Sequence, residues 1–227
     1  MIWRMSPSSE NHEHQRCTHR DSHDHLHDHH WPTGGIMDDA TAEWYVRNYG
    51  DDPTNHVTVA VAELKPDDIV LDVGCGSGPA VREAAARLAR GRAIGLDPSP
   101  AMLRIAAELS ASHPERARME FLEGGASHLP LAGHSVTVAW AINSLHHWAD
   151  PARGLSEVLR VLASQGRFLV TEDEHGGGKF GHGDGPFSDA AFVMRALEET
   201  GFVRVDISRH SGDEGGILII SCRRAEG

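Results

Sequence analysis

Residues 69–78 read Ile-Val-Leu-Asp-Val-Gly-Cys-Gly-Ser-Gly, an apolar run that passes through one acid into three alternating glycines. The apolar run favours a buried parallel strand. The glycines favour a tight turn at which the backbone approaches a ligand closely. Residues 81–90 are rich in Ala and favour a helix. This order of strand, glycine turn and helix predicts the start of a βαβ unit that binds a nucleotide-like ligand at its turn.

The spacing of the glycines excludes two common phosphate-binding motifs. A dinucleotide fingerprint, G-x-G-x-x-G, requires a third glycine at the position of Pro79, and a Walker loop requires a following Gly-Lys-Ser/Thr. Asp72, two residues before the first glycine, is an unfavourable neighbour for a phosphate. It suits a ligand that carries an ammonium or sulfonium charge. The alternative is an ordinary strand-to-helix turn in another α/β protein.

Composition limits the partners. The chain has 227 residues, of which 40% are hydrophobic and 24% charged. It can therefore bury the core of one domain plus an extension. Its formal net charge of −12 argues against nonspecific binding to nucleic acid and to anionic membranes. We therefore expect neither a nucleic acid nor a membrane as partner, and the oligomeric state stays open.

The cysteines and the N-terminal residues indicate the cellular compartment in which the protein is expected. Cys17, Cys75 and Cys222 are far apart and form no Cys-x-x-Cys pair, so neither a disulfide framework nor a cysteine zinc site is predicted. The sequence has no hydrophobic signal core at residues 1–9 and no run of about 18 apolar residues. A reduced, cytoplasmic compartment is the expectation.

Residues 1–31 differ from the rest of the chain. Eight of the 17 histidines lie in this segment, interleaved with aspartates and with few aliphatic residues, which predicts a flexible tail. Imidazoles and carboxylates are ligands for Zn²⁺ or Ni²⁺, so metal binding is one interpretation and a solvated tail with incidental affinity is the other. The candidate ligands are His23, His25, His27, His29 and His30.

Helical and strand patterns alternate along the remaining chain. Helices are predicted at 38–49, 56–64, 81–90, 101–111, 150–163 and 188–200, and strands at 69–73, 92–96, 118–122, 136–141, 167–171, 202–207 and 216–222. The second strand ends in Asp97. An acid at this place in a βαβ unit accepts hydrogen bonds from ribose hydroxyls. Asp72, the glycine turn and Asp97 together predict an adenosine ligand with a positive charge.

Residues 72–78 closely resemble the first motif of the class I S-adenosylmethionine-dependent methyltransferases. Residues 123–130, 141–148 and 155–166 resemble further stretches of the small-molecule branch, typified by the ubiquinone/menaquinone biosynthesis methyltransferases. The resemblance covers about residues 38–222. It implies an α/β, Rossmann-like, doubly wound, seven-stranded sheet that is mostly parallel with an antiparallel last strand. It divides the chain into a tail (1–31), a helical lid segment (32–64) and the methyltransferase domain (65–227).

The resemblance also implies the residues that bind the cofactor, S-adenosylmethionine. One contact differs from the family: Gly125 stands where an aspartate usually reaches the adenine amino group, and only the backbone N–H of Ala126 is left to bind adenine. Among the aromatic residues of the lid segment, Tyr49 is the preferred contact. The implied cofactor-binding residues are Tyr49, Asp72, Gly74, Cys75, Gly76, Gly78, Asp97, Pro98, Met102, Ala126, Ser127 and Asn143.

The reaction implied by the resemblance is methyl transfer to a small-molecule acceptor. A base is needed only if the acceptor loses a proton, and the candidates are His147 and His175, while His146 is interpreted as a packing residue. The glycine-rich loop at 176–186 is either a substrate lid or a long connection. The alternatives for function are a metal-binding protein and a cofactor-binding partner without catalysis. The sequence does not identify the acceptor.

Overall fold

The computed structural model describes residues 37–50, 52–175, 179–180, 185–211 and 216–227, without the side chains of His175 and Lys179. The helices are α1 (Asp39–Tyr49), α2 (Pro53–Val61), α3 (Pro79–Arg87), α4 (Pro100–Ser110), α5 (Pro151–Val161) and α6 (Ala190–Thr200). The 3₁₀ turns are η1 (Arg116–Arg118), η2 (Leu145–His147) and η3 (Pro186–Ser188). The strands are β1 (Ile69–Val73), β2 (Arg92–Asp97), β3 (Met119–Glu123), β4 (Val136–Ile142), β5 (Leu162–His175), β6 (Lys179–Phe180), β7 (Phe202–Ser211) and β8 (Gly216–Arg224).

The strands form one sheet in the order β3-β2-β1-β4-β5-β8-β7, and the two-residue β6 pairs with β5 off this path. Strands β1 to β5 pair in parallel, whereas β8 lies antiparallel between β5 and β7. The predicted doubly wound sheet, with its antiparallel last strand, is confirmed. The strand order reverses between β1 and β4, and open α/β sheets bind their ligands beyond the strand ends at such a reversal.

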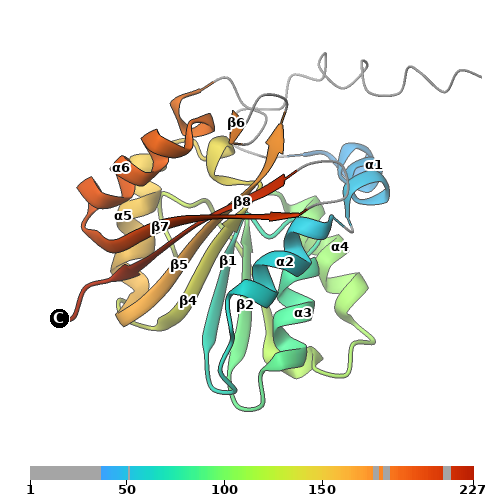
Figure 1. Ribbon diagram of the computed structural model, residues 1–227. Coiled ribbons are helices and arrows are strands. Elements are labelled where there is room, and N and C mark those ends of the chain that lie inside the picture. The colour runs from blue at the N-terminus through green and yellow to red at the C-terminus, as the bar shows by residue number, and fades with distance from the viewer. Residues whose placement is uncertain (1–36, 51, 176–178, 181–184, 212–215) are drawn as a thin grey trace, which may run out of the picture. The chain divides into compact units, whose positions relative to one another are not determined.

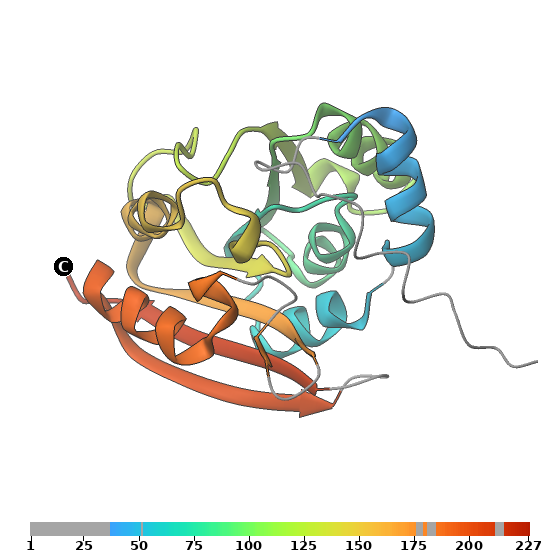
Figure 2. The same cartoon turned by 90° about the horizontal axis from the view of Figure 1, so that it is seen from above.

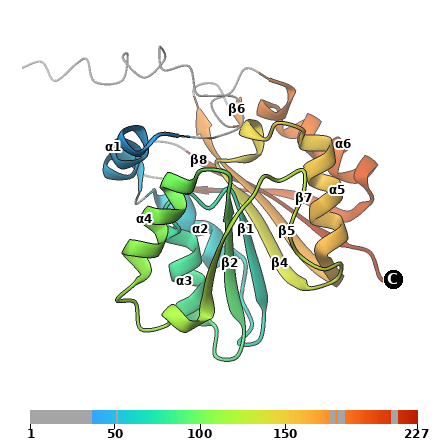
Figure 3. The same cartoon turned by 180° about the vertical axis from the view of Figure 1, so that it is seen from behind.

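Helices cover both faces of the sheet (Figures 1 and 3). α5 and α6 pack over one face on a core that includes Leu71, Val136 and Phe168. The other face carries α2 and α3 over a core that includes Val138 and Trp140. Because parallel strands are buried on both faces, β1 and β4 are apolar along nearly their whole length.

Helix α1 lies beside α4, as the view from above shows (Figure 2). Its first turn is capped by Asp38, whose side chain accepts a hydrogen bond from the Thr41 N–H. The residue before the cap, Met37, exchanges hydrogen bonds of 3.3 and 3.4 Å with the Ser99 hydroxyl, directly after β2. Arg104 of α4 adds an ion pair to Asp39 at 3.2 Å. These contacts hold α1 over the carboxyl end of β2.

Several element ends differ from the expectation by a few residues, among them those of α2 and β7, and the start of β5 differs most. The fifth strand, predicted at 167–171, begins at Leu162, because residues 163–166 form a bulge rather than a separating turn. The pairing partner of Val136 is Leu162, whereas Val138 pairs with Arg167. Gln165 adopts a left-handed φ of 61° at this bulge. The short strand β6 was not predicted, since it lies within the glycine-rich loop.

Candidate functional site

The glycine turn after β1 needs its glycines for different reasons. Gly74, Gly76 and Gly78 all have left-handed φ angles, of 85°, 51° and 76°. A Cβ on Gly74 would lie 2.7 Å from Cβ of Ser144, and one on Gly78 would lie 2.8 Å from Cε1 of Phe121. A Cβ on Gly76 would meet no described atom within 4 Å. Gly74 and Gly78 are therefore required by packing, whereas Gly76 borders open space.

Asp97 ties the end of β2 to the glycine turn. Its carboxylate accepts hydrogen bonds from the backbone N–H of Gly76 and of Ser99, each at 2.9 Å. The residue is 6% exposed. This burial raises the pKa of the carboxyl to about 6, although the two N–H groups favour its charged form. The acid predicted to bind ribose thus sits beside the one glycine of the turn that borders open space.

Asp72 is the more deeply buried acid of the site. It is 2% exposed, and its Oδ1 has no hydrogen-bond partner among the described residues. Burial raises the pKa of this carboxyl to about 7; the neighbouring Trp140 on β4 lowers it, and the charge of Asp97 raises it further. An unpartnered buried carboxylate oxygen is costly unless a ligand satisfies it.

These groups fit a cationic adenosine cofactor. The two acids below the turn suit a positive charge, and the open space at Gly76 admits a close ligand. Asp97 lies where a ribose acceptor is expected. A phosphate would be repelled by both carboxylates. The arrangement therefore matches S-adenosylmethionine better than a nucleotide.

The predicted residues on the adenine side lie around the same strand ends. Met102 is 2% exposed in the first turn of α4, and Ala126 is 9% exposed. Ser127 and Pro98 are partly buried. Burial raises the thiol pKa of Cys75 well above its usual value, so the thiol is neutral.

Gly125, which replaces the expected acid, is exposed. A Cβ there would meet nothing within 4 Å in the described chain. The position therefore has room for a side chain that this sequence does not supply.

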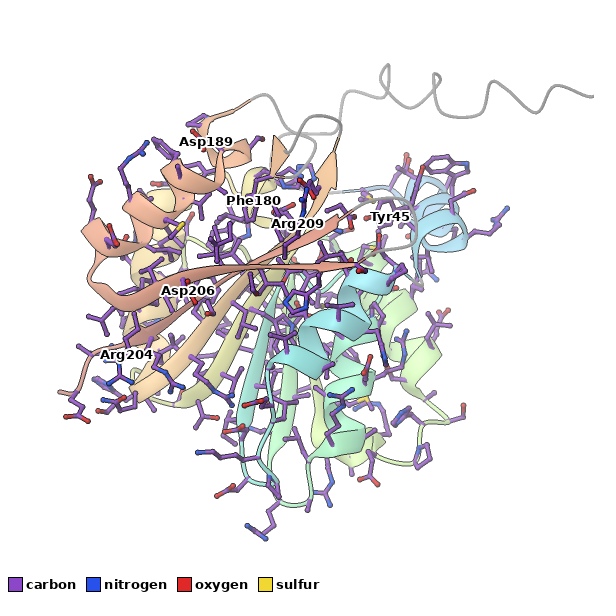
Figure 4. All side chains as sticks on the ribbon, in the orientation of Figure 1. Tyr45, Phe180, Asp189, Arg204, Asp206 and Arg209 are labelled. Carbon is purple, nitrogen blue, oxygen red and sulfur yellow. The ribbon has the colours of Figure 1, made fainter. Side chains whose placement is uncertain are left out.

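The rings of Tyr45 and Tyr49 on α1 pack against each other, with their centroids 5.3 Å apart, but they differ in exposure. Tyr49, the predicted contact, is 36% exposed and lines a cavity of about 430 Å³ together with Arg47 and Leu109. Tyr45, which lies on α1 at the upper edge of the sheet in Figure 4, is more enclosed. Burial raises the pKa of Tyr45 to about 12, and the charges of Asp52, Asp173 and Asp97 add to this shift.

Sequence reasoning preferred Tyr49 to Tyr45. The signal available to it was the i, i+4 spacing of the two residues, which places both rings on neighbouring turns of one helix. The orientation of the two rings relative to Asp97 and the other acids depends on how α1 is attached to Ser99 through Met37.

Asn143 lies at the end of β4 with a left-handed φ of 46°. Its side chain exchanges two hydrogen bonds with Asp173 of β5, at 2.9 and 3.0 Å, and donates a third to the Thr54 hydroxyl of α2 at 3.2 Å. Asn tolerates the left-handed region better than most residues. The predicted contact Asn143 is thus a junction between β4, β5 and α2.

The turn after β4 carries the two adjacent histidines. Ser144 donates a hydrogen bond to the Val73 carbonyl at 2.7 Å, and the His147 N–H bonds back to the Ser144 carbonyl at 3.0 Å. The rings of His146 and His147 are 3.9 Å apart. Nδ1 of His146 lies 3.0 Å from the Glu172 carboxylate of β5.

The remaining predicted residues lie partly outside the described structure. His175 ends β5 and pairs with Lys179, but its side chain is not described. The tail at 1–31 and its candidate metal ligands, His23, His25, His27, His29 and His30, lie outside the described residues. Within the described part of the chain, no group of three or more His, Cys, Asp or Glu side chains is placed to hold a metal ion. No helix there is long and apolar enough to cross a membrane.

Comparison with known proteins agrees with this geometry. A family profile described as a methyltransferase domain matches residues 71–170, the span from β1 to β5. Residues 71–170 therefore match a methyltransferase domain. The methyltransferase domain is similar to the demethylmenaquinone methyltransferase of Symbiobacterium thermophilum, with 36% identity over 118 residues. That match covers 50% of this chain and 46% of the relative, so the chain spans about half the length of the relatives it matches.

Two solved structures share the fold. An S-adenosylmethionine-dependent methyltransferase from Aquifex aeolicus superposes with a TM-score of 0.66 at 19% identity, covering 83% of this chain and 100% of that one. A 1,6-didemethyltoxoflavin-N1-methyltransferase from Burkholderia thailandensis, solved with 1,6-didemethyltoxoflavin and S-adenosylhomocysteine, gives 0.64 at 19% identity, covering 82% and 85%. The predicted fold is confirmed, and the match of residues 71–170 to a methyltransferase domain agrees with the predicted family.

Proposed function

We propose that the protein transfers a methyl group from S-adenosylmethionine to a small-molecule acceptor. The observation that carries the proposal is the pair of buried acids, Asp72 and Asp97, below a glycine turn with open space at Gly76. A cationic adenosine ligand satisfies both acids, and the class of domain agrees with this cofactor.

The residues around the turn have distinct tasks in this proposal. Asp97 accepts the ribose hydroxyls, the glycine turn lies against the amino-acid part of the cofactor, and Asp72 supports its positive charge. Tyr45 closes the site from α1, ahead of Tyr49. The lid role of segment 32–64 is assigned to α1 and α2. The adenine is bordered by Met102, Pro98, Ala126 and Ser127, and Cys75 packs beneath the turn.

The bound cofactor supplies a methyl group that a sulfonium already activates, so the protein mainly positions the reactants and excludes water. The acceptor site is expected where β4 and β5 end, beside Asn143 and the histidine turn. His147 and His175 are retained as candidate proton acceptors. The names of the relatives favour a reduced quinone, and 1,4-naphthohydroquinone is a suitable first acceptor to test.

Titration calorimetry with S-adenosylhomocysteine tests the cofactor assignment. Asp97→Ala removes an acceptor of two backbone N–H groups and of the ribose, and hydrogen bonds to a charged group are worth about 1.5–3 kcal/mol each. We expect its dissociation constant to rise at least about a hundredfold, and that of Asp97→Asn to rise less. Unchanged affinity in Asp97→Ala would contradict the assignment.

Transfer of a radioactive methyl group to an acceptor panel tests the activity itself. Tight binding of the cofactor without transfer to any acceptor would favour the non-catalytic alternative, in which the missing acid at Gly125 is one sign of lost catalysis.

Metal binding by the histidine-rich tail is a separate proposal that rests on composition alone. Calorimetric titration with Zn²⁺ and Ni²⁺ should give tighter binding to the full chain than to a variant without residues 1–31. Equal, weak binding to both would contradict it.

A further inference from the structure

We propose that His146, held by Glu172, accepts the proton of the acceptor nucleophile, and that the acceptor is therefore a proton-bearing nucleophile such as a phenol, an enol or a hydroquinone. The inference rests on the proposed function. It replaces the interpretation of His146 as a packing residue.

The turn that carries His146 is fastened directly to the glycine turn. Ser144 donates to the carbonyl of Val73, the last residue of β1, and its Cβ occupies the space that a side chain on Gly74 would need. Two residues later, His146 lies in η2 at the carboxyl end of β4. The histidine thus stands between the cofactor turn and the strand ends where the acceptor is expected.

His146 and Glu172 form a buried pair of an imidazole and a carboxylate. Nδ1 lies 3.0 Å from the carboxylate oxygens, and the two side chains are 4% and 1% exposed. Burying such a pair costs desolvation that an apolar pair would avoid, so it is weak support for the fold. Pairs of a buried carboxylate and a histidine recur where an imidazole takes up a proton.

The three successive acids at the end of β5 each have a different partner. Asp173 faces Asn143, and Glu174 pairs with Arg209, which extends from β7 (Figure 4). Glu172 is the acid that faces His146.

The other groups packed near the pair add few charges. Helical turn η3, which packs on η2, contributes Pro186, Phe187 and Ser188 and so no titratable side chain. Among the described residues, His147 is a further titratable neighbour, with its ring 3.9 Å from that of His146.

The pair determines which ring nitrogen is basic. A carboxylate accepts a hydrogen bond from the Nδ1–H, so the neutral imidazole carries its lone pair on Nε2. When Nε2 takes up a proton, the charge of Glu172 stabilises the resulting imidazolium. Glu172 is a positioning residue, and His146 is the group assigned to the acceptor.

The step balances without a further reactant. The lone pair of the acceptor forms the new bond to the methyl carbon, the carbon–sulfur bond breaks, and its electron pair remains on sulfur. The acceptor proton passes to Nε2 of His146 and leaves to water after the product departs. An acceptor without a proton, such as thiocyanate, does not need the histidine.

The experiment compares His146→Gln, Glu172→Gln, their double variant and His147→Gln with wild-type protein. The matched control is His134→Gln, at the exposed residue just before β4. S-adenosylhomocysteine affinity is measured first, by calorimetry. Methyl transfer is then measured with 1,4-naphthohydroquinone and phenol as proton-bearing acceptors and with thiocyanate as the proton-free one. Long-range ¹H–¹⁵N spectra of the histidine rings report the tautomer of His146.

We expect all variants to bind S-adenosylhomocysteine within about twofold of wild type. General-base catalysis is worth about 10²–10⁴-fold, so His146→Gln should lower kcat for a proton-bearing acceptor at least about a hundredfold. It should also remove the acidic limb of the pH–rate profile, and Glu172→Gln should shift that limb and abolish the Nδ1–H tautomer. Because the pair acts as a unit, the double variant should lose no more than His146→Gln.

The proposal is overturned if His146→Gln keeps the wild-type kcat and pH profile, if His147→Gln alone removes the acidic limb, or if wild-type protein methylates only thiocyanate. It is also overturned if cofactor-bound wild-type protein methylates none of the proton-bearing acceptors. If the wild-type protein does not bind S-adenosylhomocysteine, the proposed function itself is refuted.

Discussion

Two carboxyl groups beneath the glycine turn make the ligand-free site sensitive to pH. The pKa values of Asp72 and Asp97 are raised to about 7 and about 6 by burial. An acid with a raised pKa binds more protons folded than unfolded, so it costs stability as the pH rises from about 4 to about 7. A shift of one unit corresponds to about 1.4 kcal/mol.

Binding of S-adenosylmethionine should release protons near pH 6, because its positive charge favours the ionised form of both acids. We expect calorimetry in two buffers of different ionisation enthalpy to detect this release between about pH 5.5 and 7. Asp97→Asn should release less, and so should S-adenosylhomocysteine, which lacks the sulfonium charge. Binding heats that do not depend on the buffer at pH 6 would contradict this assignment of the raised pKa values.

A substitution at Gly125 is expected to raise the affinity for the cofactor. The residue is exposed with open space around its missing Cβ, so Gly125→Asp introduces a carboxylate without a clash. One added hydrogen bond to adenine is worth about 1 kcal/mol, so we expect the dissociation constant of S-adenosylhomocysteine to fall about threefold to tenfold. Gly125→Ala is the matched control. An equal effect of both substitutions in calorimetry would argue against a carboxylate contact.

Among individual residues, the positions of those next to the glycine motif were easier to predict than the positions of distant ones. Asp72 and Asp97 have positions determined by the strands that carry them. The helix that carries Tyr45 is attached through Met37 to Ser99, and His146 is paired with Glu172, so both positions depend on residues far away in the sequence. Local spacing cannot distinguish either tyrosine of α1 from the other, nor one histidine of η2 from its neighbour. The roles of all these residues stay predictions.

Among the elements, the bulge at the start of β5, just after α5, holds one residue in a strained backbone conformation. Gln165 has a φ of 61°, a conformation that costs an ordinary residue about 1–2 kcal/mol and glycine little. Gln165→Gly should therefore raise the free energy of unfolding by about 0.5–1 kcal/mol, after the greater conformational entropy of glycine in the unfolded state is subtracted from the relieved strain. Urea denaturation measures the change. Gln165→Ala should bring no gain, and a gain from Ala would point to another cause.

The predicted elements were confirmed except at their ends. A helical pattern places α5, and a continuous apolar run places β4, each within two residues of its observed ends. The pattern fails at β5, where a bulge lets strand pairing continue through residues 163–166. Such a bulge depends on the partner strand, which a local pattern does not contain.

Across the whole domain, β8 joins the two hydrophobic cores. Ile219 faces the core under α2 and α3, and Ile220 faces the core under α5 and α6, both fully buried. The doubly wound sheet with an antiparallel last strand was predicted from the family resemblance, since alternating strands and helices alone do not say which neighbours pair. The alternation does predict the parallel part of the sheet.

Because one strand contributes to both cores, the described domain should unfold in one transition. Ile219→Val and Ile220→Val should each cost about 1 kcal/mol and shift the same denaturation midpoint. Tryptophan fluorescence and far-ultraviolet circular dichroism should report coincident curves. Ile207→Val on β7, where the side chain is 38% exposed, is the control with little effect. Two separated midpoints would show that the cores melt independently.

The interior position of β8 also affects biosynthesis. A ribosome makes β5 and β7 before the strand that must lie between them, so the nascent sheet has an unpaired edge on each of these strands. Until residues 216–224 emerge, β5 and β7 can pair with edges of other chains. A stall or early stop before β8 is therefore expected to give aggregates rather than a smaller folded product.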